Sequence, residues 1–460
     1  MTEYLPESIM YAVGEMKEVS RNQFKIFTTS ADTASSGKIV QFSLPENCLI
    51  DTKSVKMFMD VACQGVIDAS APPVPANDIF AKLPNYSSTL ISRMEIYANG
   101  VQLSAGSSLY GTIAQVLRLS ESNISKDTST DRTLQHSYIT TTQADDDETL
   151  CINEWVGFMG NGSTRYLNLG LIGSVTVRLT FSPNSVLVPL QRGQNVGDNF
   201  TNATALANAQ GISYSVSNMY FLCDTLSLDP LYSDLLRERL EQGGLAVNYP
   251  EMYSFTLDGI QASPNQSAQL RFALSSGCIT KCFATYQDTN ANGVVGVPAH
   301  RLPSASGVAA EIANCLRFRS YSGETVKSGS ANFGWTVNNV KYGQADLSWF
   351  NGLANLAYAQ DKVDVDNSGS LVTSKPEYND GKFVYPLLLE MPTGRGVAVQ
   401  SSFNSRGINS QMVFAGRNLV VPAASAAPDL NDSGSASCFV VASTVAQLRI
   451  QLGRDLLCVY

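Results

Sequence analysis

The stretch SRMEIYANGVQLSAGSSLYGTIAQVL, residues 92–117, predicts a strand, a tight turn at Asn99-Gly100, a return strand and a short amphipathic helix. Asn-Gly favours a two-residue hairpin because both residues readily adopt positive φ angles. We expect Ser107 to cap the helix. The apolar face of the helix is formed by side chains at the spacing of one helical stripe, namely Leu109, Ile113, Val116 and Leu117.

A second stretch of the same kind, FGWTVNNVKYGQADLSWFNGLANLAYA, occupies residues 333–359. Asn338 corresponds to Asn99 in the turn, and Asp346 takes the capping place of Ser107. The apolar stripe of the helix is matched, at the same spacing, by Trp349, Leu353, Leu356 and Ala357.

A pair of segments upstream of the two hairpins also indicates a repeat. KIVQFSLPENCLIDTKSVKMFMDV (38–61) is similar to AQLRFALSSGCITKCFATYQD (268–288), with Phe42 opposite Phe272. Because repeats are recognised by the order and spacing of their elements more than by identity, we interpret the two halves as an internal duplication.

Alternation with period two dominates the chain and predicts strands that are buried on one face. In SVTVRLTF (174–181) the apolar residues fall on alternate positions, and ISYSVSNMYFL (212–222) is predicted to place one face together, formed by Tyr214, Val216, Asn218, Tyr220 and Leu222. Clusters of Gly, Ser, Asn and Pro separate the strands, and helical signals are few. This pattern is typical of an all-β sandwich or barrel with long loops.

The clearest break in the pattern is LSLDPLYSDLLRERLEQGG (226–244). Asp229 is a good N-cap, Pro230 suits the first helical position, and Gly243-Gly244 ends the helix. We therefore expect a linker helix that divides the chain into halves of similar size.

Composition limits the classes of function. The chain has 460 residues, of which 44% are hydrophobic and 15% charged, so it can bury a large core. Its net charge is −9, and it has no run of Lys or Arg, which argues against direct nucleic-acid binding. The N-terminus lacks the pattern of a signal peptide, and no apolar segment has the length of a membrane span, so we expect a soluble, unexported chain.

Catalytic and metal-binding motifs are weak. His136 and His300 lie in polar contexts without a recognisable motif, and no nucleotide-binding loop is present. DTNANG (288–293) and DVDNSG (364–369) resemble half of a calcium loop but lack its final Glu, so turns are the favoured interpretation. For the acidic run DDDE (145–148), a solvated loop is favoured over a divalent-ion site. We assign no catalytic, cofactor or metal residue.

Nine cysteines, an odd number, lie mostly inside apolar strand-like runs. We expect buried, reduced side chains, and we regard zinc binding by Cys278 and Cys282 as a weak alternative. The first residues form a separate arm with an apolar stripe. This arm lies either on its own domain, or on a neighbouring subunit or the underside of an assembly.

Taken together, the segments FKIF, GKIVQFSLP, SVKMFMDV, SRMEIYANGVQL, DPLYSDLLRERLEQGG and GWTVNNVKYG resemble, in pattern and order, a double jelly-roll major capsid protein of the adenovirus hexon-like lineage of icosahedral double-stranded DNA viruses. The resemblance covers about residues 20–460. It implies an all-β fold of two tandem eight-stranded jelly-roll β-sandwiches with short inserted helices. The expected division is an N-terminal arm (1–22), a first jelly roll (23–227), a linker helix and turn (228–245) and a second jelly roll (246–460).

The resemblance also implies a function. Three copies would form a pseudo-hexameric homotrimer, a capsomer that tiles the icosahedral shell of a virion assembled inside the host cell. The implied partners are the chain itself in the trimer and in neighbouring capsomers, penton or minor capsid proteins, and an internal membrane or minor protein contacted by the arm. No enzymatic activity is implied.

An alternative from another class is a secreted or surface two-domain β-sandwich protein that binds carbohydrate or acts as a glycosidase. The aromatic-bearing stretch LSWFNG (347–352) favours it, whereas the missing signal peptide and the unpaired-looking cysteines oppose it. A hydrolase would need two carboxylates that converge on one cleft.

Overall fold

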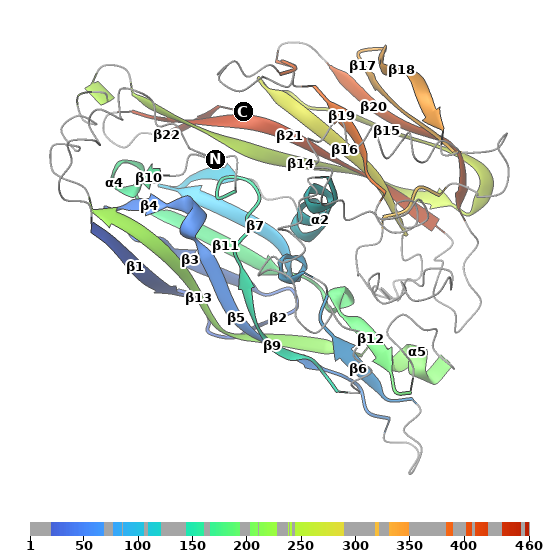
Figure 1. Cartoon of the computed structure of the whole chain (residues 1–460), viewed down its shortest axis with the longest axis horizontal. Helices are drawn as coiled ribbons and strands as arrows, with labels where there is room; N and C mark the ends of the chain where they lie inside the picture. Colours follow the sequence, from blue (N-terminus) through green and yellow to red (C-terminus); the bar gives the residue numbers. More distant parts are fainter. Residues whose placement is uncertain are drawn as a thin grey trace.

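Antiparallel strands build most of the structure, which is a computed structural model (Figure 1). The structure describes residues 20–68, 77–84, 86–104, 109–120, 144–160, 166–193, 203–209, 211–227, 238, 240–241, 244–288, 318–321, 331–348, 383–389, 402–406, 410–421, 435–451 and 456–459.

The second half of the chain is a jelly roll. Eight of its described strands form two facing sheets, ordered β14-β21-β16-β19 and β15-β20-β17-β18. Numbered from the first strand of the half, these orders are 1-8-3-6 and 2-7-4-5, which is the wrapping of a jelly roll. The strands are β14 (Leu245–Gln261), β15 (Ser263–Ala273), β16 (Ile279–Asp288), β17 (Asn332–Val337), β18 (Val340–Ser348), β19 (Tyr385–Leu388), β20 (Gln411–Val421) and β21 (Ser435–Ile450), and β22 (Leu456–Val459) extends the first sheet beside β21.

The first half repeats this topology. β1 pairs with β13, the order β13-β5-β9 continues that sheet, and the facing sheet is β3-β11-β7-β8. The strands are β1 (Ser20–Phe27), β3 (Ile39–Ser43), β5 (Lys56–Gln64), β7 (Ile91–Ala98), β8 (Val101–Ser104), β9 (Asp147–Ile152), β11 (Val175–Phe181) and β13 (Ser213–Ser227). Short strands are added at the margins, namely β2 (Ala34–Ser35), β4 (Leu49–Asp51), β6 (Ile79–Lys82), β10 (Tyr166–Asn168) and β12 (Val188–Gln191).

The predicted tandem jelly rolls are therefore confirmed, and the paired hairpins occupy equivalent places in them. Asn99 has a φ of 45° in the β7-β8 turn, and Asn338 has a φ of 49° in the β17-β18 turn. Both turns need left-handed backbone, which Asn tolerates better than most residues. Phe42 and Phe272, paired in the sequence, are both buried on the second strand of their jelly roll.

Helix α2 (Tyr110–Ser120) confirms the helix predicted after the first hairpin. The prediction that Asp346 caps a second helix is wrong, because Asp346 lies within strand β18, which continues to Ser348. Ser107 and the proposed stripe of the second helix lie outside the described residues.

The alternation predicted for residues 174–181 is confirmed in β11, whose alternate residues are buried. β13 follows its predicted alternation only as far as Val216. Asn218 has a φ of 51°, and the register with β5 shifts between Ser217 and Tyr220. Such a bulge exchanges the two faces of the strand beyond it. Tyr220 and Leu222 are therefore only partly buried, whereas the buried residues are Met219, Phe221 and Cys223.

At the break between the halves, β13 ends at Ser227 and β14 begins at Leu245. Glu238, Leu240 and Glu241 are helical, and the rest of the predicted linker helix lies outside the described residues. At the N-terminus, β1 begins at Ser20, before residue 23, where the first jelly roll is predicted to begin. No helix in the described ranges combines the length and apolar character needed to cross a bilayer.

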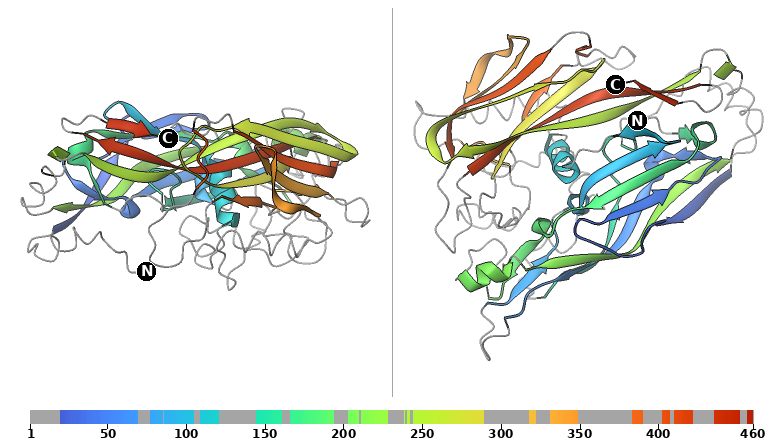
Figure 2. Two further views of the ribbon diagram at one scale, coloured as in Figure 1. Left: turned by 90° about the horizontal axis from the view of Figure 1, so that it is seen from above. Right: turned by 180° about the vertical axis from the view of Figure 1, so that it is seen from behind.

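The two sandwiches pack side by side with α2 between them (Figures 1 and 2). Each has its own apolar core between its two sheets. Tyr249 on β14 and Leu448 on β21 belong to the second sandwich but join the core cluster of the first. The Tyr249 hydroxyl also donates a 2.8 Å hydrogen bond to the carbonyl oxygen of Leu103 on β8.

Candidate interaction site

The first feature of functional interest is the outer face of the β14-β21-β16-β19 sheet, which we call the covered face. Its apolar side chains point away from the second core and are fully buried. They pack against Ile113 and Val116 of α2, with Leu109 and Leu117 beside them, which confirms the apolar stripe predicted for this helix. The members contributed by the second sandwich are Phe283, Phe318, Val384, Phe439 and Val441.

The equivalent outer face of the first sandwich belongs to the β1-β13-β5-β9 sheet, and we call it the open face. Figure 1 shows β1 and β13 on the side of the first sandwich that is remote from the second. Phe58 on β5 stacks on Tyr220 of β13 with ring centroids 5.3 Å apart, and the Lys25 ammonium lies 3.8 Å from the Tyr220 ring centroid. Phe27 lies 6.4 Å from Tyr220, and 61% of its surface is exposed.

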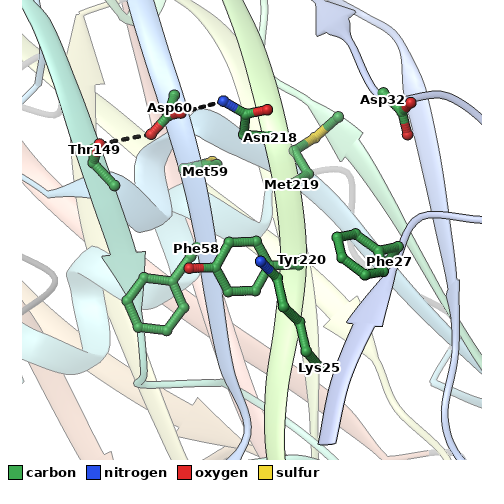
Figure 3. A pocket seen from close by; sticks show the side chains of 10 residues that line it. All are labelled: Lys25, Phe27, Asp32, Phe58, Met59, Asp60, Thr149, Asn218, Met219 and Tyr220. Carbon is green, nitrogen blue, oxygen red and sulfur yellow. Dashed lines mark hydrogen bonds between the residues drawn. The ribbon is translucent and has the colours of Figure 1, made fainter.

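These rings line a hollow of about 430 Å³ (Figure 3). The other wall of the hollow is polar. The Asp60 carboxylate accepts a hydrogen bond of 2.6 Å from the Thr149 hydroxyl and another of 2.6 Å from the Asn218 amide. These two hydrogen bonds, that from Thr149 first, lower the pKa of Asp60 because they stabilise its charged form.

The bulge at Asn218 creates this hollow. Without the register shift, Tyr220 would point into the sandwich, and the aromatic cluster on the outer face would be lost. The sequence pattern did not reveal this, because a period-two pattern contains no signal for one inserted residue other than an Asn that tolerates positive φ.

The side chains around the hollow suit contact with another protein surface better than they suit catalysis. Aromatic side chains are enriched at protein contacts, whereas Lys and Asp are depleted there, so the aromatic part of the hollow is the part that suits such a contact. Within the described ranges, no cluster of His, Cys, Asp and Glu could hold a metal ion.

The acidic run at 145–148 has a structural role that the prediction of a solvated loop missed. Asp146 is buried, and its carboxylate accepts hydrogen bonds from the Lys82 ammonium at 2.9 Å and from the Leu83 amide at 2.8 Å. Asp145 accepts a 2.8 Å hydrogen bond from the Ala81 amide. The run therefore fastens the start of β9 to β6. Because Lys82 is distant in sequence, the spacing within the run gave no sign of this pair.

Of the eight cysteines that the structure describes, four are buried, which confirms the expectation for Cys63, Cys223, Cys282 and Cys438, and the other four are only partly buried. Burial raises the pKa of the Cys223 and Cys282 thiols to about 12 and raises that of Cys63 and Cys438 further. Such thiols stay protonated and are poor nucleophiles or metal ligands. The described cysteines are all free thiols.

Several residues singled out in the sequence lie outside the described residues. They are His136 and His300, most of the DTNANG loop beyond Asp288, the DVDNSG loop and the first 19 residues of the arm.

Known proteins resemble this chain in structure, although none matches it in sequence. No family model and no curated protein matches the sequence. A chain of the PBCV-1 virus capsid is similar in structure, with 13% identity and a TM-score of 0.57 over 95% of this chain and 96% of that chain. A chain of the Sputnik virophage structure has 10% identity and a TM-score of 0.55 over 96% and 88% of the two chains. The Faustovirus major capsid protein has 10% identity and a TM-score of 0.56 over 98% and 92%.

At sequence identities this low, the structural likeness shows a similar fold and nothing more. The comparisons confirm the expected fold, since the likeness to these viral structures extends along nearly the whole chain and includes both sandwiches.

Proposed function

We propose that this chain is a major capsid protein whose homotrimers form pseudo-hexameric capsomers that tile an icosahedral shell. The observation that carries the proposal is the repeated jelly-roll topology, matched over nearly the full length by solved virus capsid structures. Two similar sandwiches per chain give three chains six similar bodies, so a threefold assembly can fill a sixfold position.

The proposal makes the chain a structural protein of the virion, assembled inside the host cell, with no catalytic residue. An acidic chain with no basic run suits a shell component that does not bind the genome directly. The carbohydrate-binding or glycosidase alternative is not favoured, because the structural likenesses are to viral chains.

The proposed organisation is an arm at 1–22, jelly rolls at 23–227 and 246–460, and a linker helix and turn at 228–245. The end of β13 at Ser227 and the start of β14 at Leu245 support the central boundary. Besides other copies of the chain, the proposed partners are penton or minor capsid proteins. The arm would contact an internal membrane or a minor protein, which flotation of the full chain and of a chain lacking residues 1–19 with liposomes would test.

The native mass and outline of the purified full-length chain test the capsid proposal. We expect a stable particle of three chain masses with a hexagonal outline in negative stain. A monomer that is retained on a glycan column would contradict the proposal.

A further inference from the structure

We propose that strand β22 fixes the orientation of the second sandwich on the first, and that trimers form only from chains in which this strand is in place. β22 pairs with the end of β21, from Gln447 to Ile450 (Figure 1). The first part of the inference concerns a single chain. The second part rests on the proposed homotrimer.

The ends of three strands of the second sandwich form a small sheet against the first sandwich, which we call the junction sheet. It consists of residues 245–249 of β14, residues 446–450 of β21 and residues 456–459 of β22. Two rows of paired residues share one face of it, namely Val247, Leu448 and Cys458 in one row and Leu245, Ile450 and Leu456 in the other. Each of these side chains packs with the core cluster of the first sandwich, although its strand belongs to the second.

β22 also contacts the first sandwich at its edge strand. It lies beside β8, which ends that sheet. The Tyr249 hydroxyl, which donates to the carbonyl oxygen of Leu103 on β8, lies 3.6 Å from the Cys458 sulfur. β22 therefore touches both partners of the hydrogen-bonded contact that joins the two sandwiches.

The equivalent place in the first sandwich is occupied by a strand with a different role. β4 follows β5 along β13, where it pairs with Thr225 and Leu226, just as β22 follows β16 along β21. Ile50 of β4 is buried in the core of its own sandwich. The inward side chains of β22 pack with the neighbouring sandwich instead, so β22 acts at the junction and not in the core of the second sandwich.

The stability of the junction sheet depends on its third strand. Without β22, only β14 and β21 would extend against the first sandwich, and a two-stranded ribbon is marginally stable and strongly twisted. The apolar contacts of Leu456 and Cys458 would be lost as well. The contact of the covered face with α2 would remain, and the second sandwich could turn about it. A closed ring requires one fixed angle between neighbouring bodies, so a variable angle opposes the trimer.

Distances within one chain test the first part of the inference. Spin labels are attached to encoded amino acids at positions 67 and 271, which are exposed and belong to the first and second sandwich respectively. Labelled chains are diluted with unlabelled chains, so that double electron–electron resonance measures distances within a chain. Leu456→Asp places a carboxylate in the apolar contact, and Leu457→Asp, at a position that is 51% exposed on the same strand, is the matched control. We expect a narrow distance distribution in the wild type and in Leu457→Asp, and a broadened one in Leu456→Asp.

Both sandwiches should stay folded in these variants. Trp155 lies in the first core and Trp335 in the second, so the tryptophan fluorescence spectrum checks this expectation. If Leu456→Asp unfolds, Leu456→Ala with Leu457→Ala as its control repeats the comparison without a buried charge.

Native mass tests the second part of the inference. The wild type and Leu457→Asp should form particles of three chain masses, and Leu456→Asp should lose them. A distribution that stays narrow in the Leu456 variants, or that broadens equally in the Leu457 variants, would overturn the inference. Trimers that persist despite a broadened distribution would overturn its second part. A wild-type chain that never forms trimers would instead contradict the capsid proposal and leave the distance result unaffected.

Discussion

The outer faces of two equivalent sheets in this molecule have opposite chemistry. On the covered face, Phe283, Phe439 and Val441 are fully buried against α2. On the open face, the outward side chains include Lys25, Asp60 and a partly exposed Tyr220. The strand order is the same in both, so topology does not determine the chemistry of an outer face. The body that packs against the face determines it.

This difference is also visible along the strands. β21, which has a core on one side and α2 on the other, is buried at almost every position from Ser435 to Ala446. β13 has a core on one side only, and as far as Cys223 it alternates between buried positions and exposed or partly exposed ones on either side of its bulge. A strand that is covered on both faces reads as a continuous apolar run, whereas a strand covered on one face alternates.

Substitution by aspartate on each face should give the largest difference in stability between the two faces. Val441→Asp puts a carboxylate into the apolar contact with α2, and we expect it to cost about 4–5 kcal/mol of stability or more. Leu222→Asp, on the partly exposed outward side of β13, should cost the isolated chain less than about 1 kcal/mol. Urea unfolding of monomeric protein measures both. Equal losses would show that the open face is already covered within one chain.

Breaking the ion pair beside the open face should have the next largest effect. Asp146→Ala leaves the buried Lys82 ammonium without its carboxylate, which we expect to cost about 3–5 kcal/mol. The neighbouring Asp147 is exposed, so Asp147→Ala is a matched control that should stay within about 0.5 kcal/mol of wild type. Thermal unfolding and proteolysis of β9 report the difference. If the two variants behave alike, the pair does not hold this edge of the sheet.

The bulge in β13 should respond to substitution more modestly. Asn218→Val places a β-branched residue at a φ of 51° and removes the amide that donates to Asp60, so we expect a loss of about 1–2 kcal/mol. Asn218→Gly keeps the backbone conformation accessible and should lose less. Denaturant unfolding compares the two variants. A Val variant as stable as the Gly variant would mean that the left-handed backbone is not needed to aim Tyr220 outward.

Much of the fold could be predicted because local patterns carry it. Alternation identified the strands, the Asn turns at Asn99 and Asn338 identified equivalent hairpins, and the spacing of Ile113 and Val116 identified the buried face of α2. The candidate site could not be predicted in the same way. It depends on a one-residue bulge at Asn218, which reverses the faces of a strand without changing its pattern.

The prediction for the acidic run at residues 145–148 failed for a related reason. Its spacing predicted a solvated loop, but Asp146 is buried because Lys82, far away in the sequence, supplies the compensating charge. Contacts between residues distant in sequence are invisible to local patterns, and they decide which polar side chains a fold can bury.

The smallest expected effect concerns the polar wall of the open face. Thr149→Val removes the hydroxyl that donates to Asp60, so the pKa of Asp60 should rise toward its ordinary value. A carboxyl whose pKa is lowered in the folded state contributes stability above its unfolded pKa, about 3.9, and loses that contribution as the pH falls through its folded value. Because the site is largely exposed and solvent screens it, we expect a difference of only a few tenths of a kcal/mol at pH 7. The difference in stability between the variant and the wild type should shrink in acid as Asp60 becomes protonated. The part of the pKa shift that comes from the Asn218 hydrogen bond should remain in the variant. Denaturant unfolding from pH 7 to pH 2 measures it, with Thr176→Val at a partly exposed position on β11 as a control. A difference in stability that grows as the pH falls would contradict the interpretation that Thr149 stabilises the charged form of Asp60. The polar wall of the open face would then differ from the covered face only in its exposure to solvent.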